Sequence, residues 1–187
     1  MADARQTRPH VGQHLSKLLL KEHHFAIEAV QTMARIIEKT EKEGLGRIRP
    51  LSHAPRTKGG AVTKAAAEVG EVLGAKYLVT FTQSGDSARR ISRLRSHLPI
   101  LAITPEIGTY NRLALSWGIE PLISPMVKHT DDMVLAADRI LIETKRAAVG
   151  EQVMIIAGAP PGIPGSTNAM RVHTVGDAVN GVVPAYK

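Results

Sequence analysis

The stretch KYLVTFTQSGDSARRISRLRSHLPILAIT, residues 76–104, decides the fold. It holds two short apolar runs, 76–81 and 99–104, which are typical of buried strands. Between them, residues 87–98 repeat apolar side chains at helical spacing. A helix that joins two buried strands predicts a right-handed crossover between parallel neighbours in one sheet.

The same alternation continues on both sides of this stretch. Helices are predicted at 61–74, 106–118 and 131–146, and further strands at 120–125, 153–158 and 170–175. The last strand follows a loop rather than a helix, which predicts that it runs antiparallel at an edge. We therefore expect an α/β fold with three layers, α/β/α, built on a mainly parallel sheet of about five strands and preceded by an N-terminal helix.

The N-terminal third of the chain is organised differently. Residues 1–23 lack a clear period and are expected to be poorly ordered or partly helical, whereas 25–39 predict an amphipathic helix. A segment rich in glycine, proline and cations follows at 43–60 and predicts a linker. The expected divisions are an N-terminus at 1–23, a helix and linker at 24–60, an α/β domain at 61–177 and a tail at 178–187.

The composition excludes several classes of protein. The chain has 187 residues and no cysteine, which excludes a disulfide scaffold, a thiol nucleophile and a thiolate metal site. No apolar stretch approaches the roughly 20 residues of a membrane span. The first ten residues, MADARQTRPH, also lack the apolar core of a secretory signal. We therefore expect a cytoplasmic protein that does not bind membranes.

The net charge of +7 suggests nucleic acid as a partner, but its distribution argues against this. Residues 1–60 hold 11 Lys or Arg against 6 Asp or Glu, whereas 61–187 hold 13 against 11. The α/β domain is thus nearly neutral, and the chain has few aromatic side chains on which bases could stack. Nucleic-acid binding through the basic N-terminus stays an alternative that the sequence does not favour.

A polar loop follows the first predicted strand and opens the next helix. Its residues are Thr82, Gln83, Ser84, Gly85, Asp86 and Ser87. Hydroxyl groups, a glycine that allows close backbone approach and free amides at a helix N-terminus together suit a phosphate group. The same residue types also form ordinary helix caps and turns, so the composition of the loop leaves both interpretations open.

A second loop, APPGIPGSTN at 159–168, follows the strand at 153–158. It contributes Gly162, Gly165, Ser166 and Thr167, and long loops of this kind are often functional, although a rigid Pro/Gly connection is the other interpretation. If the predicted strands 76–81 and 153–158 run parallel, the loops that follow them both lie at one edge of the sheet. A phosphorylated small molecule could then contact both.

Sequence motifs for catalysis are missing. The chain contains no G-x-x-x-x-G-K-[ST], no G-x-G-x-x-G and no H-E-x-x-H, and no nucleophile with an evident base. We therefore predict no catalytic residue and no metal ligand, and a site that binds rather than reacts.

Three segments together resemble a known family, the C-terminal domain of pyruvate kinase. They are residues 55–105, RLALSWGIEPLI at 112–123 and GAPPGIPGSTNAMRVHTVGD at 158–177. The similarity is colinear from about residue 24 to 177 and is strongest to bacterial, actinobacterial-like versions. Residues 25–38 resemble the helix that closes the catalytic barrel in that family.

The resemblance implies functions for both loops. Thr82, Ser84, Gly85 and Ser87 correspond to the loop that binds the phosphate of an allosteric effector, and Gly165, Ser166 and Thr167 to the loop that folds over it. Relatives activated by fructose bisphosphate carry a tryptophan and an arginine where this chain has Met126 and Met133. The expected effector is therefore AMP or a sugar monophosphate rather than fructose bisphosphate.

The family transfers a phosphoryl group from phosphoenolpyruvate to ADP in glycolysis, using magnesium and potassium on an upstream barrel. A barrel needs about 200 residues or more, so we expect a truncated form that holds no cofactor and is inactive alone. Its surfaces are expected to assemble a homotetramer, or to bind a full-length pyruvate kinase subunit. The alternative is a free-standing, non-catalytic sensor of a phosphorylated metabolite.

Overall fold

The computed structural model describes residues 10–44, 54–163 and 165–180. By its internal contacts the chain divides into two compact units, residues 1–48 and 49–187, and we describe each by itself. Within the described ranges, no helix combines the length and the apolar character that crossing a membrane requires.

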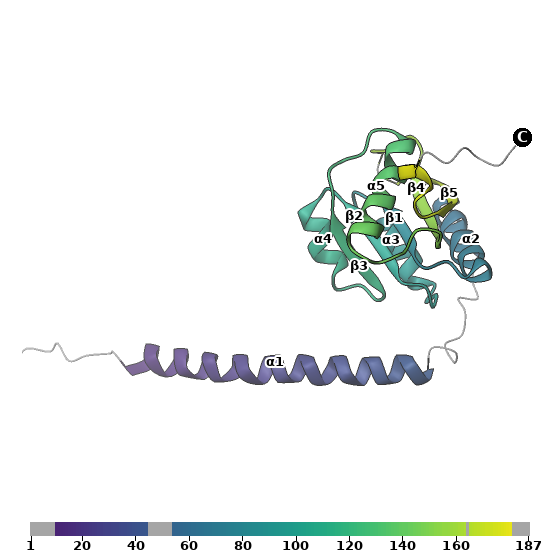
Figure 1. Ribbon diagram of the computed structural model, residues 1–187. Coiled ribbons are helices and arrows are strands. Elements are labelled where there is room, and N and C mark those ends of the chain that lie inside the picture. Colours follow the sequence, from purple (N-terminus) through teal and green to yellow (C-terminus); the bar gives the residue numbers. More distant parts are fainter. Residues whose placement is uncertain (1–9, 45–53, 164, 181–187) are drawn as a thin grey trace, which may run out of the picture. The chain divides into compact units, whose positions relative to one another are not determined.

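The first unit contains one helix, α1, which runs from His10 to Gly44 (Figure 1). It is much longer than the helix predicted at 25–39, because no proline interrupts the chain between Pro9 and Pro50 and most of the residues are good helix formers. Residues 10–23, expected to be at most partly helical, therefore belong to α1, while 1–9 lie outside the described residues. Large apolar side chains of α1 are exposed within the unit, including Phe25, Val30, Met33 and Ile37.

The second unit is built on a five-stranded sheet in the order β3-β2-β1-β4-β5. Its strands are β1 (Leu78–Phe81), β2 (Ile100–Thr104), β3 (Ile119–Ile123), β4 (Gln152–Gly158) and β5 (Thr167–Thr174). The first four strands are parallel, and β5 runs antiparallel to β4 at an edge. The predicted mainly parallel sheet with an antiparallel last strand is confirmed.

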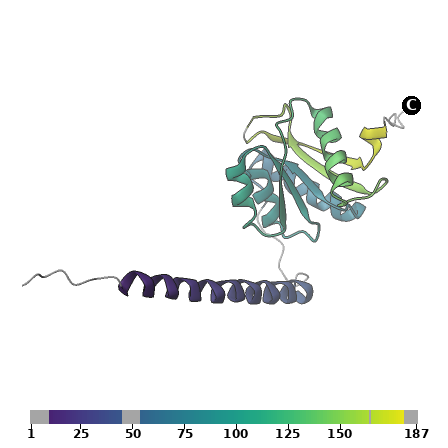
Figure 2. The same cartoon turned by 60° about the vertical axis from the view of Figure 1, so that its left-hand side comes forward.

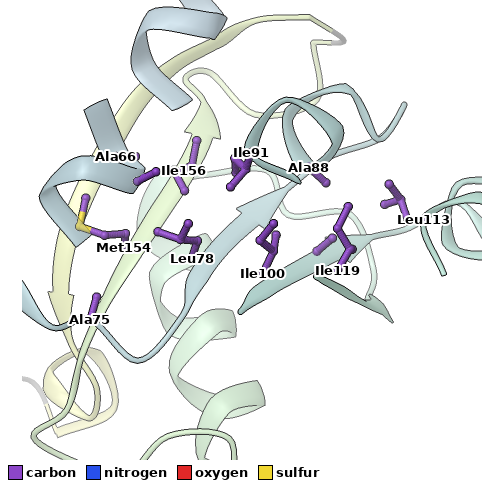
Figure 3. Packing of buried hydrophobic residues seen from close by; sticks show 12 residues of the cluster. Ala66, Ala75, Leu78, Ala88, Ile91, Ile100, Leu113, Ile119, Met154 and Ile156 are labelled. Carbon is purple, nitrogen blue, oxygen red and sulfur yellow. The ribbon is translucent and has the colours of Figure 1, made fainter. Parts of the chain in front are cut away.

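Helices cover both faces of this sheet, as Figures 1 and 2 show from two directions. They are α2 (Lys58–Leu73), α3 (Asp86–Arg93), α4 (Ile107–Leu113), α5 (Thr130–Glu143) and the short α6 (Asp177–Asn180). Adjacent residues of a strand point to opposite faces, so Leu78 and Val79 belong to two different core clusters. Side chains of α2, α3 and α4 pack on the face of Leu78 (Figure 3), and those of α5 on the other.

Several predicted boundaries are wrong. The helix α2 begins at Lys58 rather than 61, because Thr57 caps it by accepting a hydrogen bond from Gly60 N at 3.1 Å. The predicted linker at 43–60 therefore ends before Lys58, and its residues 45–53 lie outside the described residues. The helix α3 ends at Arg93 rather than 98, and α4 at Leu113 rather than 118. The helix α5 begins at Thr130 rather than 131, with His129 as its N-cap, and ends at Glu143 rather than 146.

A buried hydrogen-bonded cluster fixes the last described helix to the sheet. His173 Nε2 on β5 lies 2.6 Å from Asp138 Oδ1 on α5, and both side chains are almost fully buried. The second carboxylate oxygen, Asp138 Oδ2, accepts hydrogen bonds from the amides of Ala178 and Val179 in α6. One carboxylate thus joins three elements at the end of the α/β unit.

Candidate functional site

One pocket of the α/β unit lies where the chain changes direction across the sheet. The chain moves outward from β1 to β2 and β3, and then returns to place β4 on the other side of β1. Ligands of such sheets bind beyond the carboxyl ends of the strands at this switch point. Since β1 and β4 are parallel neighbours, the loops that follow them, 82–87 and 159–166, open at the same edge. Both loops line the pocket, as the sequence predicted.

Side-chain hydrogen bonds to backbone atoms hold the loop after β1 in place. Thr82 Oγ1 accepts a hydrogen bond from Gly85 N at 2.9 Å, and Thr109 on α4 donates its hydroxyl to Gln83 O at 2.6 Å. Gly85 is the N-cap of α3 with φ of 80°, a left-handed conformation that favours glycine. A side chain at Gly85 would also collide with Arg89. The turn therefore depends on glycine and holds the exposed Ser84 at the pocket rim.

Ser87 and Thr167 meet at the floor of the pocket. Their hydroxyl oxygens are 2.5 Å apart, and both side chains are buried. Thr167 was predicted in the loop, but it is the first residue of β5, which begins at 167 and not at 170. The two predicted loops are therefore linked by a direct hydrogen bond between α3 and β5.

The loop after β4 is held in place at both of its ends. Asn168 clamps its start, because its side chain accepts a hydrogen bond from Ala159 N and donates one to Ala159 O, both at 2.7 Å. Gly158 lies against Ser166, and a Cβ on this glycine would overlap the Ser166 hydroxyl. Gly162 and Gly165 have φ of 86° and 76°, so the loop bends where only glycine adopts the backbone readily. The segment 159–166 can thus lie close above the pocket.

The pocket also has an apolar lining. It includes Met126, Val127, Met133, Pro161 and Ile163, and Gln83 Nε2 lies 3.2 Å from Met126 Sδ. Among the described residues that line the pocket, none is Lys or Arg, and Asp86 supplies the one carboxylate. Positive potential at the pocket can come from the start of α3 and its helix dipole, and from Arg89, whose Nη2 donates to Ser84 O at 3.1 Å.

The residues expected from the sequence are thus brought together. Those that line the pocket are Thr82, Gln83, Ser84, Ser87, Gly162, Gly165, Ser166 and Thr167, while Gly85 forms the turn behind them. Sequence reasoning missed Asn168 and Gly158 as supports of the second loop, although both stand in the quoted stretch 158–177. It also missed Thr109, which carries no local signal because it reaches the loop from α4.

Among the residues that the structure describes, the two groups with a clearly shifted pKa lie outside the lining of the pocket. Burial and the neighbouring Glu120 raise the pKa of Tyr77. A hydrogen bond from Ala148 N lowers the pKa of Glu151. Within the described part of the chain, no group of three His, Asp or Glu side chains is placed to hold a metal ion.

The α/β unit is similar to a domain of known proteins. Residues 60–173 match the family described as pyruvate kinase, alpha/beta domain. The chain is 46% identical over 153 residues to the pyruvate kinase of Mycobacterium tuberculosis strain H37Rv, a match that covers 82% of this chain and 32% of the relative. It is 43% identical over 148 residues to that of Corynebacterium glutamicum (79% and 31%), and 33% over 154 residues to that of Methylorubrum extorquens (81% and 32%). The chain therefore spans about a third of the length of these curated relatives.

Proposed function

Since the chain belongs to the family of the pyruvate kinase alpha/beta domain, we propose that its pocket is a regulatory site that binds the phosphate group of a small-molecule effector. The observation that carries this proposal is the convergence of two loops on one pocket. Hydroxyl-bearing residues of both loops line the same pocket as the first turn of α3. Such groups bind phosphate without a basic side chain, as helix N-termini do in other proteins.

The lining of the pocket favours an effector with one phosphate. A second phosphate would need its own donors or cations, but much of the remaining lining is apolar and includes Met126, Met133, Pro161 and Ile163. These side chains suit a flat base or a sugar ring that packs by dispersion. We therefore propose AMP or a sugar monophosphate rather than fructose bisphosphate, in agreement with the thioether side chains at 126 and 133.

We propose that the chain regulates glycolytic phosphoryl transfer and does not itself supply the reacting groups. Phosphoryl transfer requires metal ions that bridge the phosphates, and magnesium and potassium are the ions expected from the family. Among the described residues, no group of three His, Asp or Glu side chains is placed to hold a metal ion. We propose that the reaction of phosphoenolpyruvate with ADP uses residues other than those of the α/β unit.

Association with a second copy is the proposed assembly, and the edge of the sheet supports it. The strand β5 has only one partner strand, and its Met170 and Val172 are 43% and 44% exposed. On α2, Val72 is 86% exposed and Leu73 is 43% exposed. An unpaired edge beside apolar side chains is suited to a self-complementary interface. A full-length pyruvate kinase subunit is the alternative occupant, and sedimentation of the purified chain with and without such a subunit distinguishes them.

A thermal-shift panel tests the effector site. The purified chain is heated with AMP, ribose 5-phosphate, glucose 6-phosphate or fructose 1,6-bisphosphate, and the same panel is run on Ser84→Ala/Ser87→Ala. We expect a monophosphate to raise the Tm of the wild-type chain and to have little effect on the double variant. A Tm rise of the same size in both proteins would contradict the proposed phosphate loop.

A further inference from the structure

The pocket proposed for an anion contains a carboxylate, that of Asp86, which would repel a phosphate. Its charge is balanced by Arg90, whose Nε donates to Asp86 Oδ2 at 2.6 Å. Both side chains are partly exposed, 41% for Asp86 and 32% for Arg90. Partly exposed ion pairs are weak, so a change in nearby charge can alter how firmly this pair is held.

The other end of the same guanidinium reaches a different helix. Arg90 Nη1 donates to Thr57 Oγ1 at 3.0 Å, and this oxygen also accepts the hydrogen bond from Gly60 N that caps α2. A Cβ at Gly60 would lie 3.0 Å from Thr57 Oγ1 and 3.1 Å from Pro55 Cβ, so the cap of α2 is closely packed around this glycine. Arg90 therefore bridges the pocket and the first turn of α2.

We infer that Arg90 is a positioning residue that couples occupancy of the pocket to the start of α2. This inference rests on the proposed function of the site. A bound phosphate adds negative charge beside Asp86, so the guanidinium is attracted more strongly toward the pocket end of the bridge. The same Arg90 rotamer makes the hydrogen bonds to both Asp86 and Thr57. When the bond to Asp86 holds this rotamer more firmly, the bond to Thr57 at the cap of α2 is held more firmly as well.

The coupling must act in both directions. If a ligand stabilises the bridge, then the bridge increases the affinity for that ligand by the same factor. The response appears at Gly60 and Ala61, whose amides bond to Thr57 Oγ1 and Thr57 O. Thr57 lies near the N-terminal end of the α/β unit, which begins at residue 49. We therefore infer that occupancy of the pocket changes the first turn of α2 at this end of the unit.

Amide hydrogen exchange of the full chain, followed by NMR with AMP as the probe, tests this inference. In the wild-type chain, saturating AMP should slow exchange of the Gly60 and Ala61 amides by about fivefold, the size expected for one reinforced helix cap. Arg90→Gln and Thr57→Val should abolish this ligand-dependent change. Thr57→Ser keeps the hydroxyl and should retain it. Arg93→Gln removes the same charge from an exposed position of the same helix and serves as the matched control.

The affinity for AMP, measured by calorimetry on the same proteins, separates the possible outcomes. Affinity should fall by about fivefold in Arg90→Gln and stay unchanged in Arg93→Gln, as reciprocity requires. If AMP binds the wild-type chain but leaves the exchange of Gly60 and Ala61 unchanged, the coupling is wrong and the effector site stands. If neither AMP nor inorganic phosphate binds at all, both proposals are overturned.

Discussion

The hydroxyl oxygens of Ser87 and Thr167 lie 2.5 Å apart, although 80 positions separate the two residues in the chain. This hydrogen bond joins the first turn of α3 to the start of β5 and so fixes the distance between the two loops of the pocket. It is buried, so neither hydroxyl can exchange its partner for water without a movement of the loops.

Breaking this pair should destabilise the fold in a non-additive way. Thr167→Val leaves the Ser87 hydroxyl buried without a partner, which costs about 1–3 kcal/mol. The double variant Ser87→Ala/Thr167→Val should lose less than the sum of the single changes, because both members of the pair are then apolar. Urea unfolding of wild type, Ser87→Ala, Thr167→Val and the double variant measures this coupling. Strictly additive losses of stability would show that the hydrogen bond contributes nothing.

Gly158→Ala should displace the loop at 159–166. The added methyl group would overlap Ser166, so either the loop or the end of β4 has to move. We expect a loss of about 1–3 kcal/mol in the free energy of unfolding, as for other overpacked positions, together with weaker binding of AMP. Gly108→Ala is the control, since nothing lies within 4 Å of a Cβ at that position in α4. Equal stability of both variants would refute the close packing of Gly158 on Ser166.

Asp138→Ala should be among the most damaging single changes in the α/β unit. It leaves His173 buried without its partner and removes the acceptor for the amides of Ala178 and Val179. A buried donor left without its acceptor costs about 1–3 kcal/mol, and Asp138 accepts from more than one donor. Urea unfolding compared with Asp132→Ala, an exposed aspartate on the same helix, checks this. Similar small effects in the two variants would contradict the three-way contact.

The fold could be predicted from the sequence because its signals are local. Short apolar strands alternate with amphipathic helices, and the strand direction follows from the rule for crossovers. The early end of α3 could not be predicted. Its apolar spacing continues to Leu98, but the chain turns at Arg95, which has φ of 55°. The early start of β5 depends on pairing with the end of β4, a contact that has no local signature.

In the candidate site, too, features with a local sequence signal could be predicted, whereas contacts between distant residues could not. Its two loops could be found because hydroxyl groups and glycines cluster directly after strands. The bridge from Arg90 to Thr57 could not, because 33 positions separate these residues and arginines on helices mostly face solvent. Asn168 was visible as a loop residue, but only the folded chain shows that its amide clamps Ala159.

Acid should remove the stability that Glu151 supplies. The hydrogen bond from Ala148 N, with help from Lys76, lowers the pKa of Glu151 in the folded chain below its ordinary value. A carboxyl whose folded pKa is lowered stabilises the fold above its unfolded pKa of about 4.3, and this contribution is lost as pH falls through the folded value. The difference in stability between wild type and Glu151→Gln should therefore be full at pH 6 and shrink steadily as pH is lowered below about 4.3. A constant difference across this range would contradict the prediction.

The central claim is that the pocket recognises a phosphate group through the loop at 82–87. Isothermal titration of the full chain with AMP and with adenosine tests it most directly, because the two ligands differ only in that group. We expect AMP to bind at least about tenfold more tightly than adenosine, as charge-assisted hydrogen bonds of about 1.5–3 kcal/mol require. In Ser84→Ala/Ser87→Ala the two affinities should become similar. Equal binding of AMP and adenosine to the wild-type chain would contradict the claim.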